Sequence, residues 1–179
     1  MIDSLPDNFG EQRGRPYRIV AVCLGNICRS PIAEVVLRDR IASAGLGRRV
    51  VVESAGTGGW HVGKPADHRA QAVLGAHGYD TEHAARQFDP AWFAEVDLIV
   101  GMDYNNVLDV RGMAPEQEAA VRVRILRSFD PALMHLPEDD PQLEVPDPYY
   151  DDAAAFGEVL AMIEDAVDGV VDHVRLELS

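Results

Sequence analysis

The sequence of 179 residues has few cysteines, few basic residues and no long apolar run. Two cysteines do not make a disulfide framework, which favours a reducing compartment, and the ligand spacings of a structural zinc site are missing. Acidic residues outnumber lysine and arginine by 30 to 16, and the net charge is −14. This charge argues against nucleic acid and anionic membranes as partners. No apolar stretch approaches the length of a membrane-spanning helix.

Residues 1–16 are polar and lack the apolar segment of a signal peptide, so we expect a loose N-terminal tail and a cytoplasmic protein. Residues 17–179 contain no repeat, low-complexity segment or obvious linker. That length is sufficient for one domain with a full core. The prediction is therefore a tail at 1–16 followed by one domain at 17–179, with a monomer as the default state.

Apolar runs alternate with helical patterns along this domain. Strands are expected at 17–24, 50–53, 97–102 and 121–125, and helices or helical turns at 31–44, 68–77, 90–95, 104–111 and 156–174. The run at 17–24 is continuous, as in a strand buried on both faces, whereas 121–125 alternates strictly and suits a sheet edge. Alternating strands and helices predict an α/β fold with a parallel sheet covered by helices on both faces.

Three local features add detail to this prediction. Ser30 can serve as the N-cap of the first helix with Pro31 as its first residue, and Gly45 can end it. Residues 129–148 contain five prolines and many acids and are expected to form a long loop. From residue 139 to the end there are twelve acidic residues and only one basic residue, Arg175. Most of the net negative charge therefore lies far along the sequence from the first strand.

The most informative segment follows the first strand, where Cys23 and Arg29 flank a loop of five residues. The carboxyl end of a parallel strand is where such sheets bind ligands. Backbone N–H groups at a helix start bind anions, and an arginine can grip two oxygens of a phosphate. The same groups favour the thiolate form of a cysteine. Gly25 allows close backbone approach and Asn26 tolerates a left-handed conformation, so this loop is suited to a phosphate group.

A thiolate that attacks a phosphate ester must expel an alkoxide or phenoxide, which needs a proton. Asp147, between two prolines, is the expected donor, and it could then take a proton from the attacking water. Tyr149 and Tyr150 could line a flat slot for an aryl group. The alternative for Asp147 is a turn or a cap of the last helix.

These residues resemble the low-molecular-weight protein tyrosine phosphatases, especially bacterial members. The resemblance rests on residues 23–31 (CLGNICRSP), 54–57 (SAGT), Trp60, 102–103 (MD) and 147–150 (DPYY). It implies a small three-layer α/β domain with a four-stranded parallel sheet and a phosphate-binding loop after the first strand. It also implies hydrolysis of phosphotyrosine through a cysteinyl-phosphate, without a metal or other cofactor. The expected partners are tyrosine-phosphorylated proteins, with inorganic phosphate or similar oxyanions as product or inhibitor.

The resemblance also implies roles for individual residues. Cys23 would be the nucleophile, Arg29 the phosphate clamp and Asp147 the general acid and base. Ser30 would stabilise the thiolate. The remaining assignments are the phosphate-binding loop (Leu24, Gly25, Asn26, Ile27, Cys28 and Ser30), the residues that support it together with Asn26 (Ser54 and His83), and the pocket walls (Trp60, Tyr149 and Tyr150).

Other interpretations remain open at this point. Cys23 could be a core cysteine, and Cys28 could serve packing or form a disulfide with an oxidised Cys23. A thioredoxin-coupled arsenate reductase can share this fold and loop, but it needs further resolving cysteines and the sequence has none. A phosphate-binding module or a phosphocysteine carrier is a third hypothesis, although a carrier would have little use for Asp147.

Overall fold

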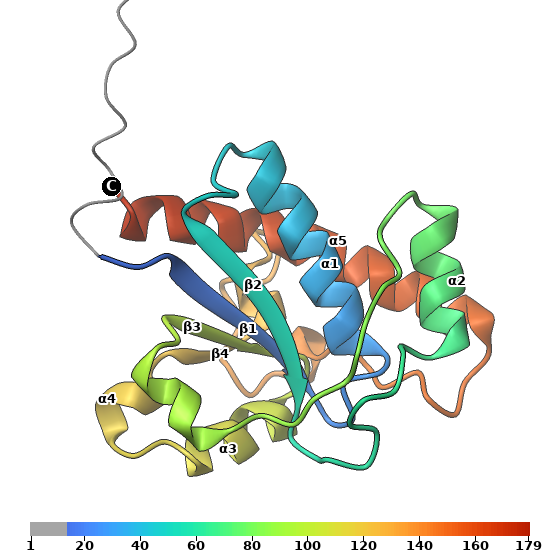
Figure 1. Cartoon of the computed structure of the whole chain (residues 1–179), viewed down its shortest axis with the longest axis horizontal. Helices are drawn as coiled ribbons and strands as arrows, with labels where there is room; N and C mark the ends of the chain where they lie inside the picture. The colour runs from blue at the N-terminus through green and yellow to red at the C-terminus, as the bar shows by residue number, and fades with distance from the viewer. Residues whose placement is uncertain (1–13) are drawn as a thin grey trace, which may run out of the picture.

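The computed structural model describes residues 14–179, so most of the expected tail at 1–16 lies outside the described residues. Four parallel strands form one sheet in the order β2-β1-β3-β4 (Figure 1). The strands are β1 (Tyr17–Cys23), β2 (Val50–Gly56), β3 (Leu98–Gly101) and β4 (Val123–Ile125). In the register of the sheet, Ile19 of β1 pairs with Val52 of β2 and with Leu98 of β3. The carboxyl ends of β1 and β3 therefore meet at the same edge.

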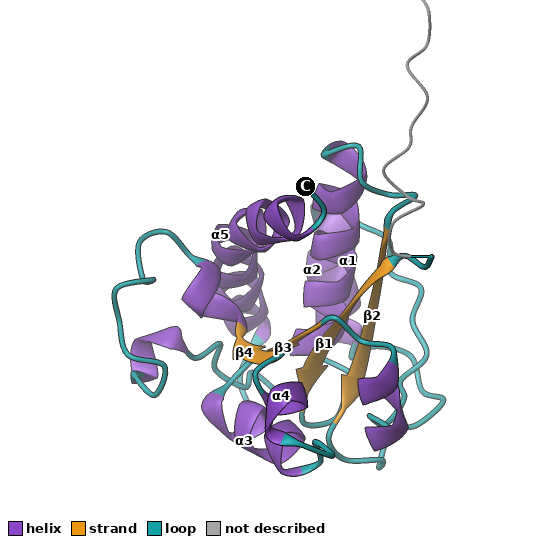
Figure 2. Cartoon of the chain, turned by 90° about the vertical axis from the view of Figure 1, so that its left-hand side faces the viewer, coloured by secondary structure: helices purple, strands orange, loops and turns teal. Residues whose placement is uncertain are grey.

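Helices cover both faces of this sheet. The α-helices are α1 (Arg29–Ser43), α2 (His68–Ala76), α3 (Tyr104–Gly112), α4 (Gln117–Ala120) and α5 (Ala153–Glu177), and the 3-10 helices are η2 (Pro90–Ala94), η3 (Leu126–Phe129) and η4 (Pro141–Leu143). Helices α1, α2 and α5 lie on one side of the sheet and α3 and α4 on the other (Figure 2). The three-layer α/β prediction is confirmed.

Each face of the sheet has its own hydrophobic core, because successive side chains of a strand point to opposite faces. Ile19 and Ala21 of β1 pack in the core between the sheet and helices α1 and α5. Val20 and Val22 pack in the core between the sheet and α3. Both sets are buried, as expected for a central strand with a continuous apolar run. The strand is thereby held from two sides, and its last residue, Cys23, has a fixed position.

The strand at the β4 edge is confirmed but is shorter than predicted. It begins at Val123, whereas Val121 is exposed. Val123 and Ile125 are buried on one face, as the alternation indicated, and the side chain of Arg124 lies over the Phe129 ring on the other, 4.0 Å from its centroid. The loop that follows is confirmed, with η4 as its helical turn.

The first helix begins earlier than predicted. Its N-cap is Cys28 rather than Ser30, and Ser30 is the second helical residue with its hydroxyl directed at other partners. The prediction of Ser30 as N-cap is therefore wrong. The end of this helix is as expected, since Gly45 follows it with a φ of +75°, a conformation that favours glycine. Within residues 14–179, no helix has both the length and the apolar character that crossing a bilayer requires.

Candidate active site

The loop between β1 and α1 is held by its carbonyl groups. The carbonyl of Cys23 accepts a hydrogen bond from Thr57 N (2.9 Å), and that of Leu24 accepts one from Gly58 N (2.9 Å). The carbonyl of Ile27 accepts one from the backbone N–H of Asp67 (2.8 Å). With these carbonyls occupied by neighbouring segments, the amides of the loop are the groups left to meet an anion.

Asn26 fixes the shape of this loop. It is fully buried and has a φ of +56°, a left-handed conformation that asparagine tolerates. Its side-chain amide donates to the hydroxyls of Ser30 (2.8 Å) and Ser54 (2.9 Å), and its Oδ1 accepts from Arg86 N (2.9 Å). All the hydrogen-bonding groups of this buried amide side chain thus have partners, so the loop is held in one conformation.

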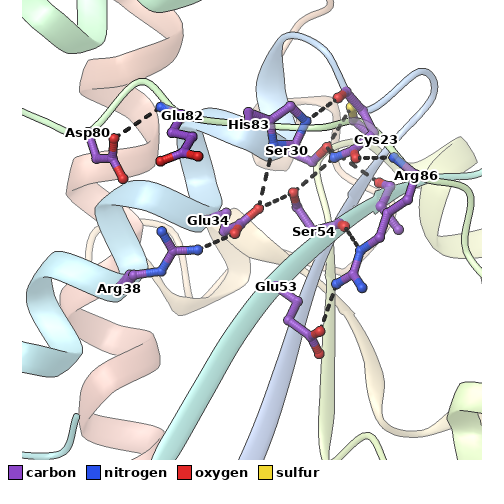
Figure 3. A network of polar contacts seen from close by, with 12 residues as sticks. Cys23, Ser30, Glu34, Arg38, Glu53, Ser54, Asp80, Glu82, His83 and Arg86 are labelled. Atoms are coloured by element: carbon purple, nitrogen blue, oxygen red, sulfur yellow. Dashed lines mark hydrogen bonds and ion pairs between the residues drawn. The ribbon is translucent and has the colours of Figure 1, made fainter. Parts of the chain in front are cut away.

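Figure 3 shows a second set of polar residues around Ser54, which includes His83 and Glu34. His83 Nε2 lies 2.7 Å from the carbonyl oxygen of Asn26, and its Nδ1 faces Glu34 at 3.9 Å. The hydroxyl of Ser54 donates to the same glutamate, which also pairs with Arg38. Ser54 and His83 are thus brought to the loop, and Glu34 joins them as a residue that the sequence analysis did not identify.

Cys23 lies at the carboxyl end of β1 with its Sγ 3.0 Å from the Ser30 hydroxyl oxygen. That hydroxyl also accepts from Asn26 and is 3.3 Å from the carbonyl of Ala55. Ser30 lies in the first turn of α1, and its hydroxyl points inward to the thiol of Cys23. It is therefore not the N-cap of the helix. The single proton of the hydroxyl can go to the carbonyl of Ala55 or to Sγ, so Ser30 is placed to donate to a sulfur anion at the point where the helix N-terminus favours negative charge.

Arg29 is almost completely buried, with 2% of its surface exposed. Its Nη1 donates to Asp103 Oδ2 (2.7 Å) and to the carbonyl of Val145 (3.0 Å), and its Nη2 lies 3.4 Å from Asp147 Oδ2. Burial opposes the charge of the guanidinium, but an ionised Cys23 and the carboxylates of Asp103 and Asp147 outweigh it and raise the pKa of Arg29. The arginine therefore carries a permanent positive charge beside the thiol.

Asp103 is a residue that sequence reasoning missed. It caps α3 in a reciprocal capping box with Asn106 and uses its other oxygen for Arg29. The signal was present, since Asp103 follows the third strand and the carboxyl ends of parallel strands gather at one edge. Residues 102–103 belong to the motifs of the resemblance, but no role was predicted for Asp103.

A cavity of about 320 Å³ opens at this edge of the sheet. It is lined by Cys23, Leu24, Gly25, Ile27, Cys28, Arg29, Trp60, His61, Asp147, Tyr149 and Tyr150. Cys23 and Arg29 are buried, whereas Trp60 is 69% and Tyr150 94% exposed, so the thiol lies at the deep end and the aromatic side chains form the rim. The Trp60 ring lies directly on Gly58, where a Cβ would be 1.7 Å from a ring carbon. His61 was not identified from the sequence.

Asp147 reaches the cavity from the loop before α5, with 43% of its side chain exposed. Its Oδ1 accepts a hydrogen bond from Tyr149 N (3.1 Å), and its Oδ2 faces Arg29. Asp147 therefore shapes a turn, as the alternative interpretation held. It also lines the same cavity as Cys23. It does not cap the last helix, because the N-cap of α5 is Asp152.

Cys28 has a different environment from Cys23. Burial, followed by the charge of Asp67, raises the pKa of the Cys28 thiol to about 12. This thiol therefore stays protonated at neutral pH. Both cysteines are free thiols in this structure.

Comparisons with known proteins agree with this geometry. A family model described as low molecular weight phosphotyrosine protein phosphatase matches residues 18–179. A low molecular weight protein-tyrosine-phosphatase of Streptomyces coelicolor is 50% identical over 163 residues, which cover 91% of this chain and 96% of the relative.

The chain belongs to the low-molecular-weight phosphotyrosine protein phosphatase family.

Two further proteins are similar to this chain over most of its length. Low molecular weight protein-tyrosine phosphatase A of Mycobacterium tuberculosis is 47% identical over 164 residues, covering 92% of this chain and 95% of the relative. The crystal structure of a protein tyrosine phosphatase from Entamoeba histolytica, with Hepes in the active site, superposes with a TM-score of 0.81 at 30% identity and covers 90% of this chain and 98% of the other. The resemblance inferred from the motifs is thus confirmed.

Proposed function

We propose that this protein-tyrosine phosphatase hydrolyses phosphotyrosine in proteins through a covalent phosphocysteine at Cys23. The single observation that carries the proposal is the convergence of three groups on one cavity: a thiol hydrogen-bonded to Ser30, a buried guanidinium, and the carboxyl group of Asp147. These groups match a nucleophile, an electrostatic clamp and a proton donor. Residues 17–179 are the proposed catalytic domain, and residues 1–16 are proposed to lie outside it.

In the first step, the Cys23 thiolate attacks phosphorus. The S–P bond forms as the bond from phosphorus to the phenolic oxygen breaks, and the protonated Asp147 gives its proton to that oxygen. Arg29 and the amides of residues 24–29 hold the phosphoryl oxygens, whose negative charge would otherwise repel the thiolate. The neutral phenol then leaves.

In the second step, water attacks the phosphocysteine. The ionised Asp147 takes a proton from the water, the new O–P bond forms, and the S–P bond breaks to regenerate the thiolate and inorganic phosphate. The Ser30 hydroxyl, 3.0 Å from Sγ, can donate to the departing sulfur. The same hydrogen bond therefore favours the thiolate both as nucleophile and as leaving group.

The shape of the cavity supports an aryl ester as substrate. The thiol lies at its buried end, and Trp60, Tyr149 and Tyr150 stand at its rim. A phenyl ring is long enough to carry a phosphate to the buried end while its faces contact these aromatic side chains. Because the nucleophile works as a thiolate, it needs a reducing environment, and we propose the cytoplasm as the location.

The test is the hydrolysis of a phosphotyrosine peptide by the purified full chain. Cys23→Ser should abolish turnover, and Asp147→Asn should slow it by about 10²–10⁴-fold, which is the usual contribution of a general acid. Asp151→Asn is the matched control, since this exposed aspartate is on the same loop and should leave turnover unchanged. Equal activity of wild type and either active-site variant would contradict the assigned roles. A phosphocysteine that water does not clear would favour the carrier hypothesis instead.

A further inference from the structure

Arg69, near the start of α2, contacts a segment that begins 80 positions further along the sequence. Its Nη2 donates to the carbonyl of Tyr149 (2.9 Å) and its Nη1 to the carbonyl of Asp151 (2.7 Å). Its guanidinium carbon also lies 4.6 Å from the centroid of the buried Phe156 ring in α5. In Figure 1, α2 and the beginning of α5 lie beside each other, with the loop before α5 passing close to α2. One side chain thus ties the loop of Asp147 to the body of the protein.

Asp67 holds this arginine in place. Its two oxygens accept from Arg69 Nε (3.0 Å) and Nη2 (2.9 Å), and Oδ1 also accepts from the backbone N–H of Arg69 (2.9 Å). These bonds hold the pKa of Asp67 below its usual range. The aspartate side chain is only 9% exposed and the arginine 21%. A two-point contact of this kind fixes the plane of the guanidinium as well as its position.

The same pair is connected to both parts of the active site. The backbone N–H of Asp67 donates to the carbonyl of Ile27 in the phosphate-binding loop (2.8 Å). On the other side, Tyr149 is held at its carbonyl by Arg69, while its N–H donates to Asp147 Oδ1 (3.1 Å). A short chain of contacts therefore runs from the phosphate-binding loop through Asp67, Arg69 and Tyr149 to the carboxyl group of Asp147.

We propose that Arg69, oriented by Asp67, is a positioning residue that sets the carboxyl group of Asp147 over the thiol. This inference rests on the proposed function, since it concerns the delivery of the proton to the leaving group. The bond from Tyr149 N occupies one carboxyl oxygen of Asp147, so the other oxygen is the one turned to the site, where it faces Arg29. Without Arg69, the carbonyls of Tyr149 and Asp151 lose their anchor and the distance from Asp147 to the leaving oxygen is no longer fixed.

A positioning role has a signature that a purely structural role lacks. An electron-poor phenol leaves readily without a proton, whereas unsubstituted phenol or tyrosine needs one. If Asp147 is displaced, kcat/KM should therefore fall for esters of weakly acidic phenols and stay nearly unchanged for esters of acidic phenols. A smaller folded fraction would instead lower the rate for every ester by the same factor. The parameter kcat/KM is the right measure, because it reports only the steps up to formation of the phosphocysteine.

The experiment measures kcat/KM for a series of aryl phosphates, from an electron-poor nitrophenyl ester to phenyl phosphate, with the full chain. Arg69→Gln should lower kcat/KM for phenyl phosphate by about 10–100-fold, part of the ~10²–10⁴ that a general acid contributes, and should hardly change it for the nitrophenyl ester. Arg69→Lys keeps the charge and the contact with Phe156 but cannot bind Asp67 and both carbonyls, so it should behave like Arg69→Gln. Asp67→Asn retains a capping side chain but loses the ion pair, and should show the same pattern more weakly.

Arg111→Gln is the matched control. Arg111 also anchors a loop from a helix, through Glu138 and the carbonyl of Val123, but it does not line the cavity. In the Arg111→Gln variant, the dependence of kcat/KM on the leaving group should match that of the wild type.

The outcomes separate the two levels of the account. Inactivity of the wild type, or an unchanged dependence on the leaving group in Asp147→Asn, would overturn the proposed function itself. A steep dependence in Asp147→Asn together with a wild-type dependence in Arg69→Gln and Arg69→Lys would overturn the role of Arg69 alone. A loss of equal size for all esters in the Arg69 variants would also overturn it, since that result indicates a structural role. A steep dependence in both sets of variants supports the inference.

Discussion

Removal of the Asp103 carboxylate tests how the buried Arg29 is held. Asp103 accepts a hydrogen bond from Arg29 Nη1 at 2.7 Å and caps α3 by accepting from Asn106 N, also at 2.7 Å. Asp103→Ala removes both interactions. Asp103→Asn keeps one acceptor oxygen, which can still cap α3, but its NH2 group replaces the oxygen that accepts from Arg29 and the charge is lost. The two variants therefore separate the ion pair from the cap.

The magnitude follows from burial. Breaking a buried ion pair costs about 3–5 kcal/mol, and we take the lower end because 20% of the Asp103 side chain is exposed. Loss of the cap adds ~1 kcal/mol, so Asp103→Ala should lose about 4 kcal/mol of the free energy of unfolding. Asp103→Asn should lose about 3 kcal/mol, because it keeps the cap of α3 but not the ion pair with Arg29.

The assay combines urea unfolding with inhibition by inorganic phosphate. Both Asp103 variants should bind phosphate more weakly, because Arg29 loses the partner that directs its guanidinium. Asn106→Ala is the control, since it weakens the cap of α3 without touching Arg29 and should leave phosphate binding unchanged. The reasoning would be refuted by Asp103 variants with the stability and the phosphate affinity of the wild type.

Three further predictions concern other parts of the molecule. In α5, Gly169→Ala should destabilise the fold by at least ~1–3 kcal/mol, because its Cβ would lie 1.9 Å from the carbonyl oxygen of Phe129. Gly157→Ala in the same helix has open space and should stabilise it by about 0.5–1 kcal/mol; a urea midpoint of Gly169→Ala at or above that of Gly157→Ala would contradict this account. Burial, and then the charge of Arg124, lowers the pKa of His173, so its contribution to stability is complete above the pKa of the unfolded state and is lost as the pH falls below it. His173→Gln should therefore lose less stability than the wild type between pH 7.5 and 5.5, an interval around the ordinary histidine value of about 6.5, as thermal unfolding can show. Iodoacetamide at pH 7 should modify Cys23 and not the protonated Cys28, and inorganic phosphate should protect against the reaction; peptide mapping that finds label on Cys28 first would argue against this.

Much of the fold and the centre of the site could be predicted because the signals are local. The apolar run of β1, the loop after it and the helical spacing of α1 lie within a single stretch of sequence. The left-handed conformation of Asn26 and the glycine that follows α1 depend on the residue types themselves. The family motifs then connected this stretch with Asp147 and the tyrosines after it.

The parts that could not be predicted depend on contacts between distant segments. Arg29 and Asp103 are 74 positions apart, and Arg69 and Tyr149 are 80 apart, so no local spacing indicates either pair. The error at Ser30 has the same origin. Serine before a helical pattern favours an N-cap, but here the hydroxyl has a tertiary partner in Cys23, and the helix starts two residues earlier.

The most direct test of the central claim is to find where the phosphate resides during turnover. Wild-type enzyme and the Asp147→Asn variant would be mixed with an electron-poor nitrophenyl phosphate, denatured within milliseconds and analysed by peptide mass spectrometry. The phenol of this ester leaves without a proton from Asp147, so the variant should form the intermediate readily and clear it slowly. The account predicts one added phosphoryl group on the peptide containing Cys23, with more of it in the variant and none in Cys23→Ser. Turnover without enzyme-bound phosphate, or phosphate attached to any other residue, would contradict the account.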